Sequence, residues 1–172
     1  MTTHPEWQGL RAVIPFERGE VWFDGTFSEP RLNHPECVLL DREGNVYCGG
    51  ERGELYRIGA DGKSIEQLAS TGGFTLGLAM DSRGRVYMCD LKHAAVFRWD
   101  PQDGSLRKFA EGFRIPNYPL IDEERGFLYV SDSHHPDRPG PGIWRVPLGG
   151  GGAELWYDQP LRFAKGMAFA KD

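Results

Sequence analysis

Short apolar runs, each followed by a turn, recur along the chain at intervals of about 40 residues. Asp41, Asp81 and Asp122 close such runs at spacings of 40 and 41 residues. Each aspartate opens a turn that contains a glycine, and a short stretch of strand-favouring residues follows. Runs of this length between turn residues predict β-strands. The strand-favouring pairs after the three turns are Val46-Tyr47, Val86-Tyr87 and Leu128-Tyr129.

Each repeat continues with a third apolar segment, written LYRI at 55–58, VFRW at 96–99 and IWRV at 143–146. Asp-Gly pairs after the first two of these segments supply hairpin turn chemistry, and polar–apolar alternation then resumes. Four short antiparallel strands in about 40 residues are the content of one propeller blade. A β-sandwich is the alternative, but it gives no reason for the same residues to return in the same order.

The repeats predict one all-β domain over residues 1–172. We interpret it as a member of the six-bladed β-propeller family of which about three four-stranded blades are present. The repeats are placed at about 37–76, 77–117 and 118–165, with the start of a fourth at 166. A content of 23 glycines and 12 prolines fits the many turns that this architecture needs.

The last residues, FAKGMAFAKD, restate the opening of a blade, so the sequence stops inside a repeat. A lone first strand exposes an unpaired sheet edge, which proteins normally cover. Residues 18–27 precede the first full repeat and could supply the outer strand with which a propeller closes its ring. Two interpretations stay open: the sequence is a piece of a longer chain, or two copies form a homodimer that completes the ring. The break inside a motif favours the first.

The composition is that of a globular protein, with 40% hydrophobic and 26% charged residues. A formal net charge of -5 leaves no basic field for a phosphate backbone, so no nucleic acid is expected as a partner. No apolar run approaches the roughly 18 residues that cross a bilayer, and the first ten residues lack the features of a secretory signal. These absences predict a cytoplasmic protein with no membrane partner. The three cysteines have no CxxC spacing, which argues against a disulfide framework and a zinc site.

Three spaced strings carry a resemblance to a known family: HPECVLLDREGNVYCGG, IPNYPLIDEERGFLYVSDS and LRFAKGMAFAKD. In this order they resemble the senescence marker protein/gluconolactonase family and its strictosidine-synthase-like relatives, over about 140 residues from Asn33 onward. The resemblance implies a six-bladed propeller that holds one divalent cation, usually calcium, on its central axis and hydrolyses lactones or esters. The strictosidine-synthase-like branch includes members that lack the metal.

The resemblance places two metal ligands on this sequence, Glu36 and Asn117. The inner strands of successive propeller blades begin near the axis, so carboxylate and amide oxygens there can converge on a hard cation. Alternatively, Glu36 is a solvated turn carboxylate and Asn117 a turn residue that follows proline.

Lys165 departs from the family pattern, because FAKG stands where the family commonly has FxNG. An ammonium beside the axis repels a divalent ion, and it could pair directly with Glu36 to give a metal-free site. Alternatively, Lys165 points into the water of the channel. Calcium or another divalent cation is therefore a candidate cofactor against which Lys165 argues.

The long loop of the third repeat, SDSHHPDRPGPG, supplies three catalytic candidates, His134, His135 and Asp132. Loops in repeat proteins commonly lengthen on the working face, and a histidine acts as a base near neutral pH. The same residues could form a solvated polar loop, and Asp132 matches Asp90 of the second repeat in position, which favours a structural turn role for both.

Two functions from different classes remain. The first is a gluconolactonase-like hydrolase of lactones or esters, in which an axial cation polarises the carbonyl and a bound water attacks it. The second is a non-catalytic, metal-free binding module in which Lys165 and Glu36 recognise a small anionic or carbonyl ligand. Lys165 weakens the first hypothesis and leaves the second intact, and the enzyme hypothesis depends on analogy between folds.

Overall fold

The computed structural model describes residues 14–170, so the prediction about a secretory signal concerns residues outside this range. Within it, one short 3-10 helix, η2 (Phe16–Arg18), precedes three four-stranded antiparallel sheets. This confirms the predicted all-β architecture with three four-stranded blades. The first blade consists of β1 (Leu39–Leu40), β2 (Val46–Gly49), β3 (Glu54–Ile58) and β4 (Ile65–Ser70). The second consists of β5 (Thr75–Met80), β6 (Val86–Asp90), β7 (Ala95–Trp99) and β8 (Leu106–Glu111). The third consists of β9 (Pro116–Asp122), β10 (Phe127–Asp132), β11 (Gly140–Pro147) and β12 (Glu154–Leu161).

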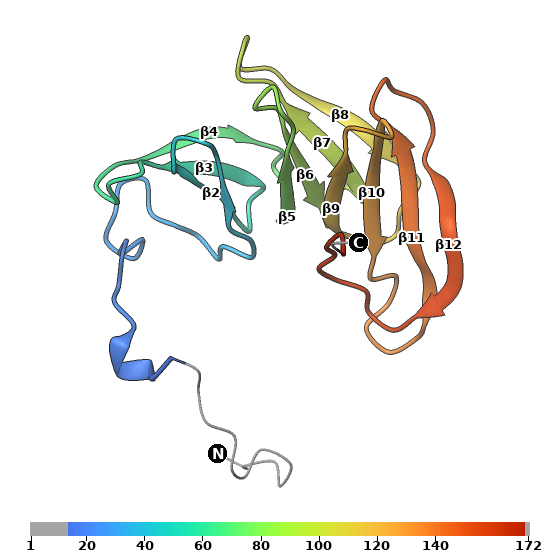
Figure 1. The fold of residues 1–172 in the computed structure, drawn as a ribbon, viewed down its shortest axis with the longest axis horizontal. Coiled ribbons are helices and arrows are strands. Elements are labelled where there is room, and N and C mark those ends of the chain that lie inside the picture. The colour runs from blue at the N-terminus through green and yellow to red at the C-terminus, as the bar shows by residue number, and fades with distance from the viewer. Residues whose placement is uncertain (1–13, 171–172) are drawn as a thin grey trace, which may run out of the picture.

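The strands of each blade lie in sequence order, so every neighbouring pair is joined by a turn. The three sheets stand side by side in an arc (Figure 1), and β5 lies against both β2 and β9. The strand register repeats from blade to blade. The second and third strands pair through Val46 and Ile58 in the first blade, Val86 and Trp99 in the second, and Leu128 and Val146 in the third. The first strands of neighbouring blades contact one another, β1 with β5 and β5 with β9, so the first strand of each blade is its inner strand.

The two larger clusters of the hydrophobic core lie between neighbouring blades. One cluster of buried side chains joins the first two blades, and a second cluster joins the second and third. Removing these apolar faces from water is the main force that stacks the blades. The first cluster contains Tyr47, Leu55, Leu78, Val86, Met88 and Trp99. The second contains Tyr87, Cys89, Val96, Ala110, Phe113, Leu128, Val130 and Val146.

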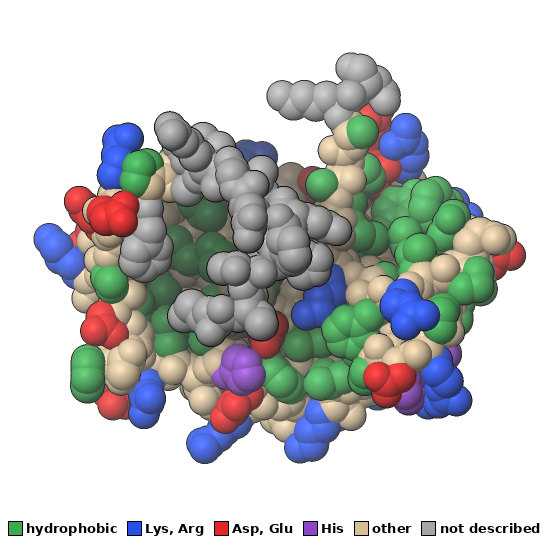
Figure 2. All heavy atoms as spheres, turned by 90° about the horizontal axis from the view of Figure 1, so that it is seen from below, with side chains coloured by type: hydrophobic (Ala, Val, Ile, Leu, Met, Phe, Trp, Pro, Cys, Tyr) green, Lys and Arg blue, Asp and Glu red, His purple; other side chains and the backbone are tan. Residues whose placement is uncertain are grey.

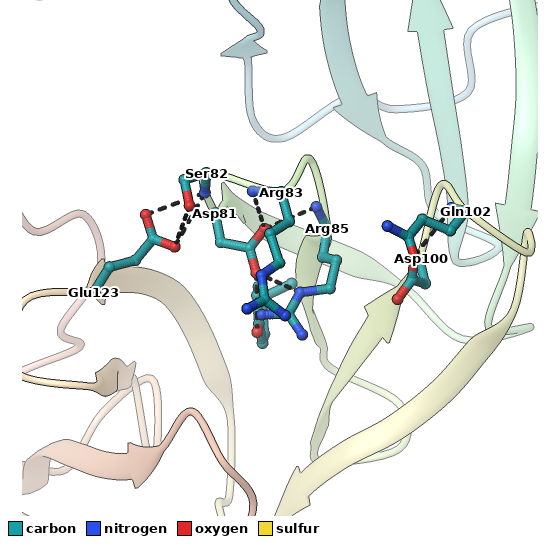
Figure 3. Close-up of polar contacts among 8 residues, drawn as sticks. Asp81, Ser82, Arg83, Arg85, Asp100, Gln102 and Glu123 are labelled. Carbon is teal, nitrogen blue, oxygen red and sulfur yellow. Dashed lines mark hydrogen bonds and ion pairs between the residues drawn. The ribbon is translucent and has the colours of Figure 1, made fainter.

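The repeated aspartates stabilise the turn after each inner strand. The Asp81 carboxylate accepts the backbone N–H groups of Arg83 and Arg85 at 3.0 Å and pairs with Nε of Arg85 at 2.6 Å (Figure 3). The neighbouring Ser82 donates its backbone N–H and its hydroxyl to Glu123 of the third blade. The glycines of these turns have φ between 75° and 85°, which explains why glycine recurs there.

The segment before the first blade does not form the strand that was considered for residues 18–27. It turns back on itself instead, with Leu32 donating its backbone N–H to Gly25 at 2.9 Å. Its side chains Phe23 and Leu32 pack on the buried cluster of Cys48, Tyr56 and Ile58. Apolar packing holds the segment on the first blade, and its role in closing a ring stays a prediction. No helix within residues 14–170 is long and apolar enough to cross a membrane.

The third blade presents an exposed apolar face. Trp156, Tyr157 and Phe169 are each at least 40% exposed, and green side chains gather at the β11–β12 end of the molecule (Figure 2). This face borders a pocket of about 470 Å³ into which Met167 and Phe169 project beside Tyr129. The equivalent faces of the first two blades are covered by the next blade. The homodimer that would cover this face stays a prediction.

Candidate functional site

The inner strands place one residue of each repeat at an equivalent position. Glu36, Leu76 and Asn117 each lie five residues before the aspartate that closes the inner strand. The string Gly166-Met167-Ala168 matches Gly77-Leu78-Ala79, so Lys165 holds the same position in the segment after β12. A propeller brings equivalent inner-strand positions together around one axis. These four residues are therefore expected to meet.

The structure does bring the four residues together. Glu36, Leu76, Asn117 and Lys165 line a single pocket of about 210 Å³, together with Gly77, Tyr118 and Gly166. The three residues proposed as metal ligands or as an axial charge thus share one site. These residues lie between positions 36 and 165 of the chain. The site is therefore formed by the stacking of blades, and it does not come from a single local motif.

Gly77 allows the inner strands to approach one another closely at the pocket. A Cβ atom at this position would lie 2.4 Å from the backbone oxygen of Asn117 and 2.8 Å from Cα of Tyr118. Such contacts are shorter than any real Cβ contact with backbone, so a larger residue would force β5 away from β9. The glycine therefore sets the spacing of Leu76 and Asn117 across the pocket.

Glu36 has a polar neighbour that the sequence did not assign. Nε2 of His34 lies 3.1 Å from Oε1 of Glu36, and Nδ1 of His34 lies 3.4 Å from Oε2 of Glu51. His34 holds a φ of 50°, which is uncommon for a residue with a side chain, and its ring packs on Phe74 with centroids 5.4 Å apart. In the sequence, the only indication of the contact between His34 and Glu36 was that one residue, Pro35, separates them.

The predicted ion pair between Lys165 and Glu36 is not formed. Among residues 14–170, the Glu36 carboxylate has His34 as its ionic neighbour, and no carboxylate lies within 4.0 Å of Nζ of Lys165. Nζ lies 5.3 Å from the centre of the Phe163 ring instead. A cation over an aromatic face gains a weak attraction that leaves its hydrogen-bond donors available. The two charges border one pocket without neutralising each other.

Two buried serines hold the segment that carries Lys165. Ser131 Oγ accepts the backbone N–H of Tyr118 at 3.1 Å and donates to the backbone oxygen of Lys165 at 2.6 Å. Ser133 donates its hydroxyl to the backbone oxygen of Ala164 at 2.7 Å. Ser131 therefore links two backbone positions of the pocket through a single hydroxyl group.

Replacing Ser131 by alanine is expected to loosen this segment, because its hydrogen bond to the backbone oxygen of Lys165, worth about 1 kcal/mol, is lost. Trypsin should then cleave after Lys165 about fivefold faster, as judged by mass spectrometry of the fragments under native conditions. Ser70→Ala is the matched control, since its hydroxyl donates to Arg52 on the first blade. Equal cleavage rates in wild type and Ser131→Ala would show that the serine does not hold the segment.

The histidine loop does not reach the pocket. Asp132 is only 2% exposed, and its carboxylate accepts the backbone N–H groups of Arg114, Ile115 and His134, each at 2.8 Å. Nδ1 of His135 accepts the backbone N–H of Asp137 at 3.0 Å. These contacts are turn and loop contacts, and none of the three catalytic candidates lines the pocket with Glu36. Their catalytic role stays a prediction.

Tyr118 lines the pocket, and Cys37 follows the pocket residue Glu36 in the chain. Burial raises the pKa of the Tyr118 hydroxyl above its ordinary value, with a smaller contribution from Cys37. Burial also raises the pKa of the Cys37 thiol, although its sulfur accepts the backbone N–H of Leu78 at 3.3 Å. Both groups are neutral at pH 7 as a result. The side-chain charges that border the pocket are those of Glu36 and Lys165.

The residues of the pocket do not fit a divalent cation. Calcium takes six to eight oxygen ligands, whereas the pocket offers the oxygens of Glu36 and Asn117 beside the ammonium of Lys165. Residues 14–170 contain no group of three or more His, Cys, Asp or Glu side chains placed to hold a metal ion. The donor set therefore disagrees with the metal site that the family resemblance implies.

Comparison with known proteins supports the fold. The sequence matches no protein-family model and no curated protein. A streptogramin B lyase aligns with a TM-score of 0.56 at 12% identity, over 70% of this chain and 39% of the lyase. A chain of a nidogen/laminin complex aligns with a TM-score of 0.65 at 19% identity, over 77% of this chain and 51% of that chain. Virginiamycin B lyase from Staphylococcus aureus aligns with a TM-score of 0.60 at 15% identity, over 80% of this chain and 44% of the lyase.

The fold is that of a β-propeller, as the sequence repeats predicted. The chain spans about half the length, or less, of these solved structures. Identities below 20% show a shared fold, and function depends on the residues that a fold carries. The likeness to the gluconolactonase family stays a prediction, because these neighbours support propellers in general.

Proposed function

We propose that the axial pocket binds a small polar molecule that carries a carbonyl or carboxylate group, without converting it. The observation that supports this proposal is the convergence of four equivalent repeat positions, Glu36, Leu76, Asn117 and Lys165, on one pocket. Concave sites with a few convergent polar groups on an apolar lining are typical of small-ligand sites. The ammonium of Lys165 and the amide of Asn117 can both donate hydrogen bonds to a carbonyl or carboxylate oxygen.

The test is ligand binding observed by saturation-transfer NMR, with gluconate, glucono-δ-lactone and methyl butyrate as probes. We expect at least one probe to bind wild type and to be recovered unchanged. Leu76→Trp, which fills the pocket, should weaken that binding at least tenfold. Leu155→Trp is the matched control, because Leu155 lies on β12 and is 41% exposed. If Leu76→Trp binds the probe as well as wild type does, the pocket is not the binding site.

A hydrolase of lactones or esters is the second candidate, supported by the shared location of Glu36 and Asn117 in the pocket. The lyases among the structural neighbours are enzymes on the same fold, which is an analogy and not a shared site. Because the pocket does not fit a divalent cation, no metal-assisted step is assigned to it. Hydrolysis of glucono-δ-lactone by wild type that Glu36→Gln abolishes would favour this candidate over simple binding.

A further inference from the structure

We infer that the ligand of the axial pocket is a small dipolar molecule, with an ammonium group at one end and a carboxylate at the other. This inference depends on the proposed function and names the class of ligand. It starts from the two opposite charges that border the pocket, Glu36 and Lys165, and from the fact that they do not pair with each other.

Glu36 keeps capacity to bind a cation. Its carboxylate has one ionic neighbour among residues 14–170, the His34 imidazole at 3.1 Å, and that contact involves Oε1. An ionised carboxylate has about four acceptor positions on its two oxygens. The side chain is 35% exposed, so it is not enclosed by the protein. An ammonium group in the pocket can therefore find an acceptor on Glu36.

Lys165 keeps capacity to bind an anion. Its Nζ atom contacts the face of the Phe163 ring, which accepts no conventional hydrogen bond, so three N–H donors remain for a ligand. The two serines hold the backbone of Lys165 and Ala164 and leave the lysine side chain unconstrained. A carboxylate at this side of the pocket gains a charged hydrogen bond.

Simple ions fit the pocket less well than a dipolar ligand does. An anion near Lys165 is repelled by Glu36, and a cation near Glu36 is repelled by Lys165. Only a ligand with both charges turns each of these groups into an attraction. The volume of about 210 Å³ has room for roughly seven water-sized groups at about 30 Å³ each.

The remaining lining suits the body of such a molecule. Leu76 and Tyr118 offer apolar surface for a short aliphatic chain. The side-chain amide of Asn117 can donate to the ligand carboxylate or accept from its ammonium. A compound such as 4-aminobutyrate, with seven non-hydrogen atoms, has the size and both charged ends.

The test compares 4-aminobutyrate with butyrate and butylamine, which each keep one charge on the same carbon chain. Binding to the full 172-residue chain is measured by calorimetric or NMR titration at low ionic strength. We expect 4-aminobutyrate to bind at least tenfold more tightly than either single-charge analogue, since each end adds a charged hydrogen bond. Butyrate that binds as tightly as 4-aminobutyrate would overturn the inference while leaving the proposed function intact.

Two variants assign the two ends. Glu36→Gln should remove the preference for 4-aminobutyrate over butyrate, and Lys165→Met should remove its preference over butylamine. Glu43→Gln and Lys63→Met are matched controls, because both side chains are exposed outside the pocket. Unchanged preferences in the first two variants would also overturn the inference. The wild-type comparison needs no variant, so a variant that fails to fold does not prevent the test.

Discussion

Asp132→Ala is expected to lower the free energy of unfolding by roughly 3–5 kcal/mol, measured by denaturation in urea. The carboxylate is 2% exposed and accepts three backbone N–H groups at 2.8 Å, so its removal leaves three donors near the third blade without partners. Two of these donors belong to Arg114 and Ile115, which lead into β9, and the third belongs to His134 in the long loop. The carboxylate thus joins both loops to the end of β10.

Asp137→Ala is the matched control, because Asp137 is an exposed aspartate of the same loop. Its stability should stay within about 0.5 kcal/mol of wild type. Asp132→Asn should fall between, since an amide keeps one acceptor oxygen. If Asp132→Ala is as stable as wild type and has lost only ligand conversion, the catalytic prediction for this residue is right and the structural interpretation is wrong.

Tyr87→Ala is expected to lower the free energy of unfolding by about 3–5 kcal/mol, which is the range for removing a large buried aromatic side chain. Tyr87 is 0% exposed in the core between the second and third blades. Its ring meets the edge of Phe109 with centroids 5.0 Å apart, and the residues of β9 and β10 close the other side. The cavity would lie where the two blades stack, so calorimetry should show a lower melting temperature.

Tyr87→Phe separates the ring from the hydroxyl. The hydroxyl lies 3.4 Å from Oδ2 of Asp81, a long hydrogen bond, so its loss should cost about 1 kcal/mol or less. Tyr129 occupies the equivalent position in the third blade, at the exposed apolar face. A Tyr129→Ala variant that loses as much stability as Tyr87→Ala would contradict the view that blade stacking gives Tyr87 its importance.

The sequence predicted the blades well because the relevant interactions are short in range. The turn aspartates bond to backbone groups two to four residues away, as Asp81 does with Arg83 and Arg85. Glycine is required locally by positive φ. Such preferences act within one hairpin and return with each repeat. The segment at 18–27 was harder, because its conformation depends on packing Phe23 and Leu32 against a surface that the first blade supplies.

The candidate site was predicted in part. Glu36, Asn117 and Lys165 were placed near one axis from repeat positions and family resemblance, and the structure brings them to one pocket. The direct Lys165–Glu36 contact is absent from the structure, where Lys165 lies over Phe163 and Glu36 contacts His34, and the roles of both residues stay predictions. A long side chain can contact any of several neighbours at similar distances. The spacing of residues in the sequence does not predict which contact forms.

By itself the sequence determined the number of strands in each blade and the turn chemistry, because these depend on periodicity and on local backbone preference. The tertiary structure alone decided which charges meet. It left Glu36 and Lys165 unpaired across one pocket, and it buried Asp132 as an acceptor for two loops. Those outcomes depend on the approach of blades separated by about 40 residues in the chain, and burial and contact at that range exist only once the blades have stacked.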